Sequence, residues 1–273
     1  MTELTQIPES DRICATPQRV TGSPIFFMHI AKTAGSYLNA TLEEALGADQ
    51  IATHVEHRMG AAADLRGLLS CGRTVISGHV MNGLWETIAA GVETRFRKVT
   101  ILREPVAHLA SHLLWLDHYN RPEFRRDYAL LDEAHQRVAD RIGAVDLTDI
   151  GHLDHYLATL GPVEKRLFDN CQSRYFIGAG HRDPRMTGVL TLADVRQLRV
   201  AAKGFDLILC QDRMAEGLAA LGNLIGVPLV PLERRVNEAK SARTIDIANP
   251  LVRQVLSCRT LLDQWLWRWV KER

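Results

Sequence analysis

A short turn near the start of the chain has the composition of an anion-binding loop. It reads Ala31-Lys-Thr-Ala-Gly35 and leads directly through Ser36 into a helical pattern. Small residues leave the backbone N–H groups of a turn accessible, and the N-terminus of a helix favours negative charge. Lys32 adds a mobile cation, and Thr33 and Ser36 add hydroxyl donors. The turn can therefore surround a phosphate or a sulfate, although an ordinary tight turn with a solvent-facing lysine is the alternative.

A second candidate anion site follows another apolar run. Arg103 comes directly after residues 98–102, and Ser111 lies eight positions later in the next helical segment. Ser111 is roughly 9 Å along that helix, at 1.5 Å per residue, so a long guanidinium and a hydroxyl can meet one phosphate from two sides. In the alternative, Arg103 pairs with Glu104 or Asp117, and Ser111 bonds to its own helix backbone.

His79 is the candidate general base. It follows Ser77-Gly78 at the end of a third apolar run, where glycine permits close approach of a substrate. An imidazole with a pKa near ~6.5 can accept a hydroxyl proton at neutral pH. The alternative is a histidine satisfied by nearby backbone. His29 is the weaker candidate, because its strand is expected to be buried.

Metal binding is not expected from the residue spacing. The chain has eleven histidines, and two pairs, His108 with His112 and His54 with His57, have the spacing of one helical face. No carboxylate or thiolate lies at ligand spacing from either pair. Five cysteines are scattered without CxxC spacing, which is typical of reduced core residues. We therefore expect core or solvated histidines and no metal.

Strands and helices alternate along the chain, which predicts an α/β fold: a P-loop-like parallel β-sheet flanked by helices. Four apolar runs predict buried strands, at residues 24–30, 74–77, 98–102 and 206–210. Parallel sheets with right-handed crossovers bind ligands outside the carboxyl ends of their strands. The three candidate sites follow three of these runs, so we expect them at one edge of the sheet.

Helical segments are predicted at residues 36–47 and 105–118 and through a large middle region, about 122–203. Thr191 is the expected N-cap and Gly204 the expected stop of the last middle helix, and Asp212 is expected to cap the helix after residue 210. A final helix opens at Asn249-Pro250. Its apolar stripe predicts core packing, or alternatively a partner-helix seam, and consists of Leu251, Val255, Cys258, Leu262, Trp265 and Trp269.

Composition describes a globular chain without a strong charge. The 273 residues are 46% hydrophobic and 24% charged, with a formal net charge of +1, so no long-range field favours nucleic acid or an anionic membrane. No run approaches the ~18 apolar residues of a membrane span, and the start of the chain lacks a signal-peptide core. We expect a cytoplasmic protein with a lead-in over residues 1–23 and a single α/β domain over 24–273.

Four segments resemble the sulfotransferase family 2 group, relatives of the heparan sulfate 2-O-sulfotransferases. Phe27-Met-His-Ile-Ala-Lys-Thr-Ala-Gly-Ser36 resembles F-x-H-I-P-K-T-A-G-T/S, and Val99-Thr-Ile-Leu-Arg-Glu-Pro-Val-Ala-His-Leu-Ala-Ser111 resembles L-R-D-P-V-x-R-x-x-S. Gly78-His79 and Asp169-Asn-Cys-Gln-Ser-Arg-Tyr-Phe-Ile-Gly178 are similar to two further family segments, the second reading N-x-Q-T-R-x-L-x-G. The likeness spans residues 25 to about 178, and the strand and helix over 206–221 also fit the family pattern.

The resemblance implies a sulfotransferase that uses 3′-phosphoadenosine 5′-phosphosulfate (PAPS) and leaves 3′,5′-adenosine bisphosphate, with no metal required. It implies an acceptor hydroxyl, carried by a carbohydrate, and His79 as the base. Lys32 would neutralise charge on the departing bridging oxygen. The loop would hold the 5′-phosphosulfate, and Arg103 with Ser111 the 3′-phosphate. The candidate cofactor-binding residues are Lys32, Thr33, Ala34, Gly35, Ser36, Tyr37, Arg103 and Ser111.

Two groups of residues are assigned to the periphery of the site. Asn170, Gln172 and Arg174 are expected to line or brace it, with helix packing as the alternative. Lys240 and Arg243 are similar to a basic flap over the cofactor, with an ordinary solvated charge run as the alternative.

Three positions depart from the family pattern. Ala31 replaces a proline, which removes a rigid φ at the loop entrance. Glu104 replaces an aspartate. His108 stands where the family often has arginine, which either weakens the grip on the cofactor or removes a surface ion pair.

Two other functions compete with sulfuryl transfer. A P-loop-like kinase needs GxxxxGK[ST], but residues 26–31 contain no glycine, and no convincing acidic residue ends a strand to hold Mg²⁺. A kinase is therefore disfavoured. A nucleotide-binding module without catalysis stays open because positions 31 and 108 depart from the pattern.

Overall fold

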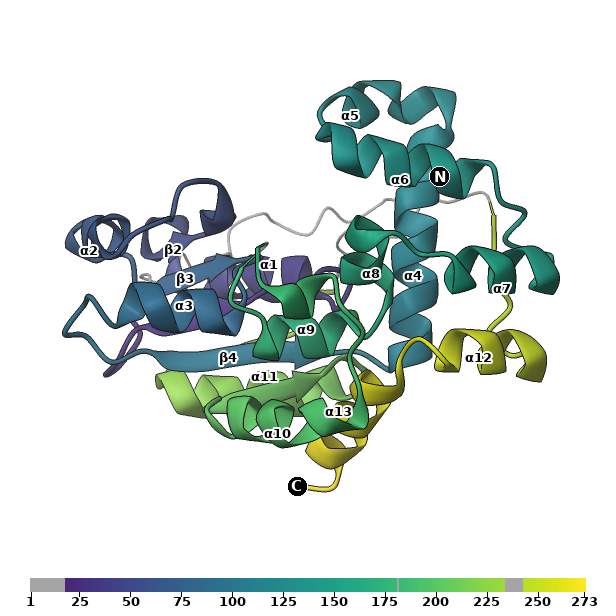
Figure 1. Ribbon diagram of the computed structural model, residues 1–273. Helices are drawn as coiled ribbons and strands as arrows, with labels where there is room; N and C mark the ends of the chain where they lie inside the picture. Colours follow the sequence, from purple (N-terminus) through teal and green to yellow (C-terminus); the bar gives the residue numbers. More distant parts are fainter. Residues whose placement is uncertain (1–17, 181, 234–242) are drawn as a thin grey trace, which may run out of the picture.

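A five-stranded parallel sheet lies at the centre of the fold (Figure 1). The computed structural model describes residues 18–180, 182–233 and 243–273. The strand order is β2-β3-β1-β4-β5, and every pair is parallel. The strands are β1 (Ile25–Met28), β2 (Ile51–Ala52), β3 (Val75–Gly78), β4 (Arg97–Leu102) and β5 (Leu207–Cys210). The α/β prediction is confirmed, and only β2, which is two residues long, was not predicted.

The central strand β1 lies where the strand order reverses. It pairs with β3 on one side and with β4 on the other, so that Met28 lies opposite both Gly78 and Thr100. In such sheets the crevice at the carboxyl ends of the strands beside the reversal is the usual ligand site. The loop after β1 and the residues after β3 and β4 are thereby brought to one edge.

Side chains of β1 alternate between two hydrophobic cores, as expected for a strand buried on both faces. Ile25 and Phe27 pack against α1 (Gly35–Leu46) and α11 (Met214–Ile225). Phe26 and Met28 face the opposite core. The helices that contribute to that core, on the other face of the sheet in Figure 1, are α3 (Asn82–Ala89), α9 (Cys171–Ile177), α10 (Val195–Lys203) and α13 (Leu261–Lys271), with α2 (Ala62–Ser70) at its edge.

The first part of the predicted helical middle region packs around α4 (Pro105–Asp117), which follows β4, and together they form a third core. Glu104 caps α4, because its carboxylate accepts a hydrogen bond from the Ala107 N–H at 2.7 Å. The helices that pack around α4 or its neighbours are α5 (Arg125–Ala129), α6 (Glu133–Gly143), α7 (Ile150–Ala158), α8 (Pro162–Phe168) and α12 (Pro250–Ser257). Short 3₁₀ turns join the elements at Ala48–Gln50, Val55–His57, His118–Asn120, Pro122–Phe124, Pro184–Met186, Leu192–Asp194 and Gln211–Arg213.

Two predictions about helix ends are wrong, whereas Gly204 ends α10 as expected and Thr191 caps the 3₁₀ turn that precedes it. Asp212 does not cap α11. It lies within a 3₁₀ turn, and its carboxylate pairs with the Lys271 ammonium at 2.6 Å. The helix predicted from Asn249-Pro250 is instead two helices, α12 and α13.

The break between α12 and α13 changes which face of each helix is buried. Leu251 is 59% exposed and Cys258 is exposed, so the predicted stripe is not a continuous packing face. Val252 and Leu256 of α12 are buried instead. The prediction assumed one continuous helix, in which residues three or four apart lie on the same face. A break in the helix rotates the second part relative to the first, so residues on either side of it no longer share a face.

Among the described residues we find no helix with the length and apolar character needed to cross a bilayer.

Trp85 of α3 gives the first test of this packing. Its ring stacks on Phe26 with centroids 3.7 Å apart and meets Phe96 edge-on at 4.9 Å. We predict that Trp85→Ala lowers the free energy of unfolding by about 3–5 kcal/mol, measured by urea denaturation. Leu130→Ala is the control, because Leu130 is 85% exposed. Equal losses in the two variants would contradict the packing.

Candidate functional site

The loop after β1 has two residues in the left-handed backbone region. The φ angles of Lys32 and Ala34 are 66° and 72°. This conformation is uncommon for residues other than glycine and directs successive N–H groups of a turn to one side. Ala34 is the N-cap of α1, and no side chain caps that helix end. The described structure thus leaves the N-terminal N–H groups of α1 without a side-chain acceptor, as an anion site requires.

Contacts behind the loop fix its shape. The buried Thr33 hydroxyl donates to the Ile30 carbonyl at 2.8 Å and so stabilises the loop itself. Contrary to the expectation, its proton is not available to a ligand. A Cβ on Gly35 would lie 2.0 Å from the His29 ring, so only glycine fits there. Ser36, half-buried at the start of α1, is the hydroxyl of the loop that stays available.

Arg103 contacts the loop directly. Its Nη1 donates to the Lys32 carbonyl at 3.2 Å. The Gln172 side chain holds the Arg103 backbone at two points, accepting from its N–H at 2.9 Å and donating to its carbonyl at 3.0 Å. The two predicted anion-binding segments therefore meet at the carboxyl ends of β1 and β4.

The predicted alternative partners of Arg103 are engaged elsewhere. Glu104 pairs with Arg253 at 2.6 Å, and Asp117 pairs with Arg243. In the described part of the chain, neither Lys32 nor Arg103 has a carboxylate within ion-pair distance. Arg103 is thus left to face the loop.

Two cations are held close together in this half-buried site. Burial lowers the pKa of the Lys32 ammonium, and the neighbouring Arg103 lowers that pKa further. Burial also lowers the pKa of Arg103. An anion bound between the two side chains would reverse both effects, because it stabilises the charged forms.

Helix α4 contributes a hydroxyl and an aromatic ring. Ser111 is half-buried, and its hydroxyl makes no hydrogen bond to any described residue. The Lys32 ammonium lies 5.8 Å from the centroid of the Trp115 ring, one helical turn beyond Ser111. Sequence reasoning missed Trp115, although its spacing of four from Ser111 places both on one face of the helix.

His79 has one ring nitrogen committed and one free for chemistry. Its Nδ1 lies 2.6 Å from the His29 carbonyl, so Nδ1 carries the proton and Nε2 keeps the lone pair. Burial is the main cause that lowers the pKa of His79, opposed by Glu56. The imidazole is therefore neutral at pH 7, as a general base must be.

Glu56 is a residue of this site that sequence reasoning missed. Its Oε2 accepts from the His79 N–H at 3.0 Å. A Cβ on Gly78 would lie 2.5 Å from that same oxygen, which explains the glycine before His79. The segment around Glu56 has no pattern in the sequence that connects it to residue 79.

Of the three predicted peripheral residues, Gln172 supports Arg103, whereas Asn170 and Arg174 stabilise the packing of helices. Gln172 braces Arg103, as described above. Asn170 accepts from the Leu262 N–H at 2.7 Å and so caps α13. Arg174 is fully buried and pairs with Asp169 at 2.8 Å. For Asn170 and Arg174 the structure places the side chains in helix packing.

Of the predicted flap residues the structure describes only Arg243, and it places Tyr37 within α1. Lys240 lies outside the described residues. Arg243 pairs with Asp117 and donates to the Val145 carbonyl at 2.6 Å. The Tyr37 hydroxyl accepts from the Leu232 N–H at 2.9 Å and so fixes the segment after α11 on α1.

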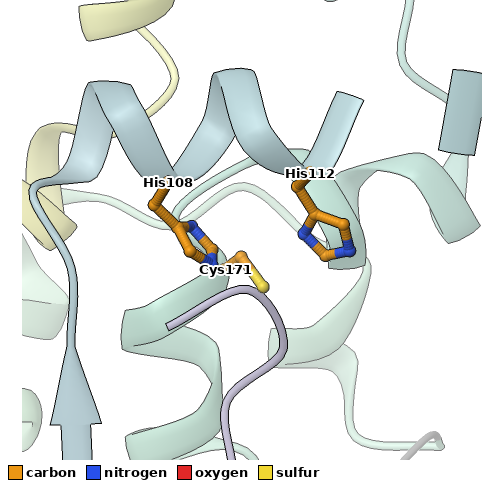
Figure 2. A group of neighbouring side chains, drawn as sticks. All are labelled: His108, His112 and Cys171. Atoms are coloured by element: carbon orange, nitrogen blue, oxygen red, sulfur yellow. The ribbon is translucent and has the colours of Figure 1, made fainter. Parts of the chain in front are cut away.

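Among the residues that the structure describes, two groups of side chains could hold a metal ion, contrary to the expectation that no thiolate converges on the histidines. His108, His112 and Cys171 are all buried, with ligand atoms within 4.8 Å of one another (Figure 2). His54, Glu56 and His79 form the second group, and these three are partly exposed. Cys171 was missed because it comes from α9, far along the sequence from α4.

The comparisons with known proteins add no relative: no family model matches the chain, and a search of curated proteins finds no match.

The buried histidines generate a prediction about pH. Burial lowers the pKa of His29 to about 3 and that of His108 to about 4, and it lowers the pKa of His112 well below its usual value. Below about pH 6.5 the unfolded chain therefore binds protons that the folded chain does not, so stability falls as pH falls, by up to about 1.4 kcal/mol per pH unit per histidine.

Urea denaturation from pH 7.5 to 5, with a chelator present, measures this slope. His112→Leu should reduce the slope of unfolding free energy against pH by up to about 1.4 kcal/mol per pH unit, the contribution of one proton. His152→Gln, on the exposed surface, should leave the slope unchanged. A free energy of unfolding that is constant over this range would contradict the assignment.

Proposed function

We propose that the chain is a PAPS-dependent sulfotransferase that transfers a sulfuryl group to an acceptor hydroxyl. One observation carries the proposal: the contact at 3.2 Å between Arg103 and the Lys32 carbonyl joins the two predicted anion-binding segments beside His79. PAPS carries anionic groups at both ends of its ribose, so it needs two cationic subsites. A carbohydrate acceptor rests on the resemblance of the motifs alone.

In this proposal the loop and Arg103 bind opposite ends of the donor PAPS. The N–H groups of the left-handed turn and the N-terminus of α1 hold the 5′-phosphosulfate. Arg103, with its backbone fixed by Gln172, and Ser111 hold the 3′-phosphate. The fixed positions of these groups supply alignment, which is a large part of catalysis in group transfer.

Transfer then follows from the charges of the site. A bond forms between the acceptor oxygen and sulfur, and the bond from sulfur to the phosphate oxygen breaks. The acceptor proton moves to Nε2 of His79. The electron pair of the broken bond stays on the 5′-phosphate of 3′,5′-adenosine bisphosphate, where the Lys32 ammonium neutralises it.

Ligand binding separates this proposal from a kinase. A ligand that binds only the folded state stabilises it by about 2.7 kcal/mol at a hundredfold excess over Kd. We predict that 3′,5′-adenosine bisphosphate raises Tm in the presence of a chelator and that ATP with Mg²⁺ raises it little. The reverse ranking in a thermal-shift measurement would favour the kinase and overturn the proposal.

Two variants separate binding from chemistry and so test the non-catalytic alternative. His79→Asn should keep the Kd for 3′,5′-adenosine bisphosphate and lower turnover by ~10²- to 10⁴-fold. Arg103→Ala should instead weaken that Kd by about 10- to 100-fold, because it removes a hydrogen bond to a charged group.

Turnover is measured with labelled PAPS against a panel of glycans, lipid alcohols and small hydroxylated metabolites. His152→Asn on the exposed face of α7 is the matched control and should change neither quantity. Normal turnover by His79→Asn would remove His79 from the role of base. Binding without transfer to any acceptor would support the non-catalytic module.

A further inference from the structure

A buried group of metal-ligand side chains lies behind the anion loop, outside the machinery described above. His108 and His112 are one turn apart on α4, and Cys171 is the first residue of α9. The three residues are 1%, 2% and 4% exposed, and their ligand atoms lie within 4.8 Å of one another. Figure 2 shows both imidazoles and the thiol directed toward the same space between the two helices.

His112 is the unusual member of this group. Both of its ring nitrogens are buried, and neither has a hydrogen-bond partner among the described residues. Leaving a buried polar group unpaired is unfavourable, so such atoms normally have a protein, water or ion partner. His108, in contrast, is partnered, because its Nε2 lies 2.8 Å from the Ala31 carbonyl. An unpartnered imidazole directed toward a second imidazole and a thiol is the arrangement that a metal ion would complete.

The donor set selects the kind of ion. Two imidazole nitrogens and one thiolate suit Zn²⁺ and its tetrahedral substitute Co²⁺, and they do not suit Mg²⁺ or Ca²⁺, which prefer oxygen. Bond lengths of about 2.0–2.3 Å to zinc place ligand atoms about 3.3–3.8 Å apart, so the side chains need to close by at most about 1.5 Å. The Cys171 thiol releases its proton to solvent on binding.

We propose that His108, His112 and Cys171 bind one Zn²⁺ ion that joins α4 to α9 behind the anion loop. A water molecule or the Ala31 carbonyl oxygen, beside His108, completes the coordination. The ion would fix both helices that carry the site, because α4 holds Ser111 and α9 holds Gln172. This role is structural and does not depend on the proposed function, so either proposal can fail without the other.

Metal content and cobalt spectra test the site on the full chain. The protein is stripped with a chelator, loaded with Zn²⁺ or Co²⁺ and dialysed. We expect one tightly held equivalent of metal, a thiolate-to-cobalt charge-transfer band and a higher Tm with Zn²⁺. Cys171→Ser should lose the band and the rise in Tm. Cys210→Ser is the matched control, because Cys210 is also a buried free cysteine but belongs to β5, and it should retain both.

Three results would overturn the proposal. The first is wild-type protein that retains no stoichiometric metal, in which case the His112 nitrogens face water or stay unpaired. The second is a charge-transfer band that persists in Cys171→Ser. The third is a folded His112→Leu variant, checked by circular dichroism, that binds Zn²⁺ as tightly as wild type.

Discussion

The site depends on two cationic side chains that are held together at the edge of the sheet. Arg103 donates to the carbonyl of Lys32, and neither cation has a carboxylate partner among the described residues. Burial and the neighbouring Arg103 lower the pKa of Lys32, and burial lowers the pKa of Arg103. The fold maintains this arrangement through contacts that involve no charge, chiefly the left-handed loop and the packing of β1 on both faces. An anion bound between the two side chains would relieve this imbalance of charge, which supports the anion site that we propose.

Periodicity and turn chemistry were enough to predict most of the fold. Four of the five strands, the start of α4 at Pro105 and the helical middle region all follow from local signals. The two-residue strand β2 is too short for a pattern, and the break between α12 and α13 is a tertiary effect, because Asn170 of a distant segment caps α13. The site residues show the same contrast between local sequence signals and tertiary contacts. Lys32, His79 and Arg103 follow strands and were found, whereas Glu56 and Cys171 reach their places only through the packing of segments far apart in the chain.

Two positions at which the sequence differs from the sulfotransferase motifs that it resembles are in contact with each other. The Ala31 carbonyl lies 2.8 Å from Nε2 of His108, so the residue in place of a proline and the residue in place of an arginine touch behind the loop. The imidazole at position 108 contacts the loop backbone directly, and it puts no guanidinium of its own next to Lys32 and Arg103. The loop entrance, which has no proline, is therefore held by a side-chain contact in place of a rigid φ angle.

The brace on Arg103 is an amide. Gln172 both accepts from and donates to the Arg103 backbone, and a glutamate at the same place could only accept in its ionised form. A carboxylate would also add a permanent negative charge next to the guanidinium and compete with any incoming anion. The neutral amide therefore holds the Arg103 backbone in position without reducing the positive charge beside the loop.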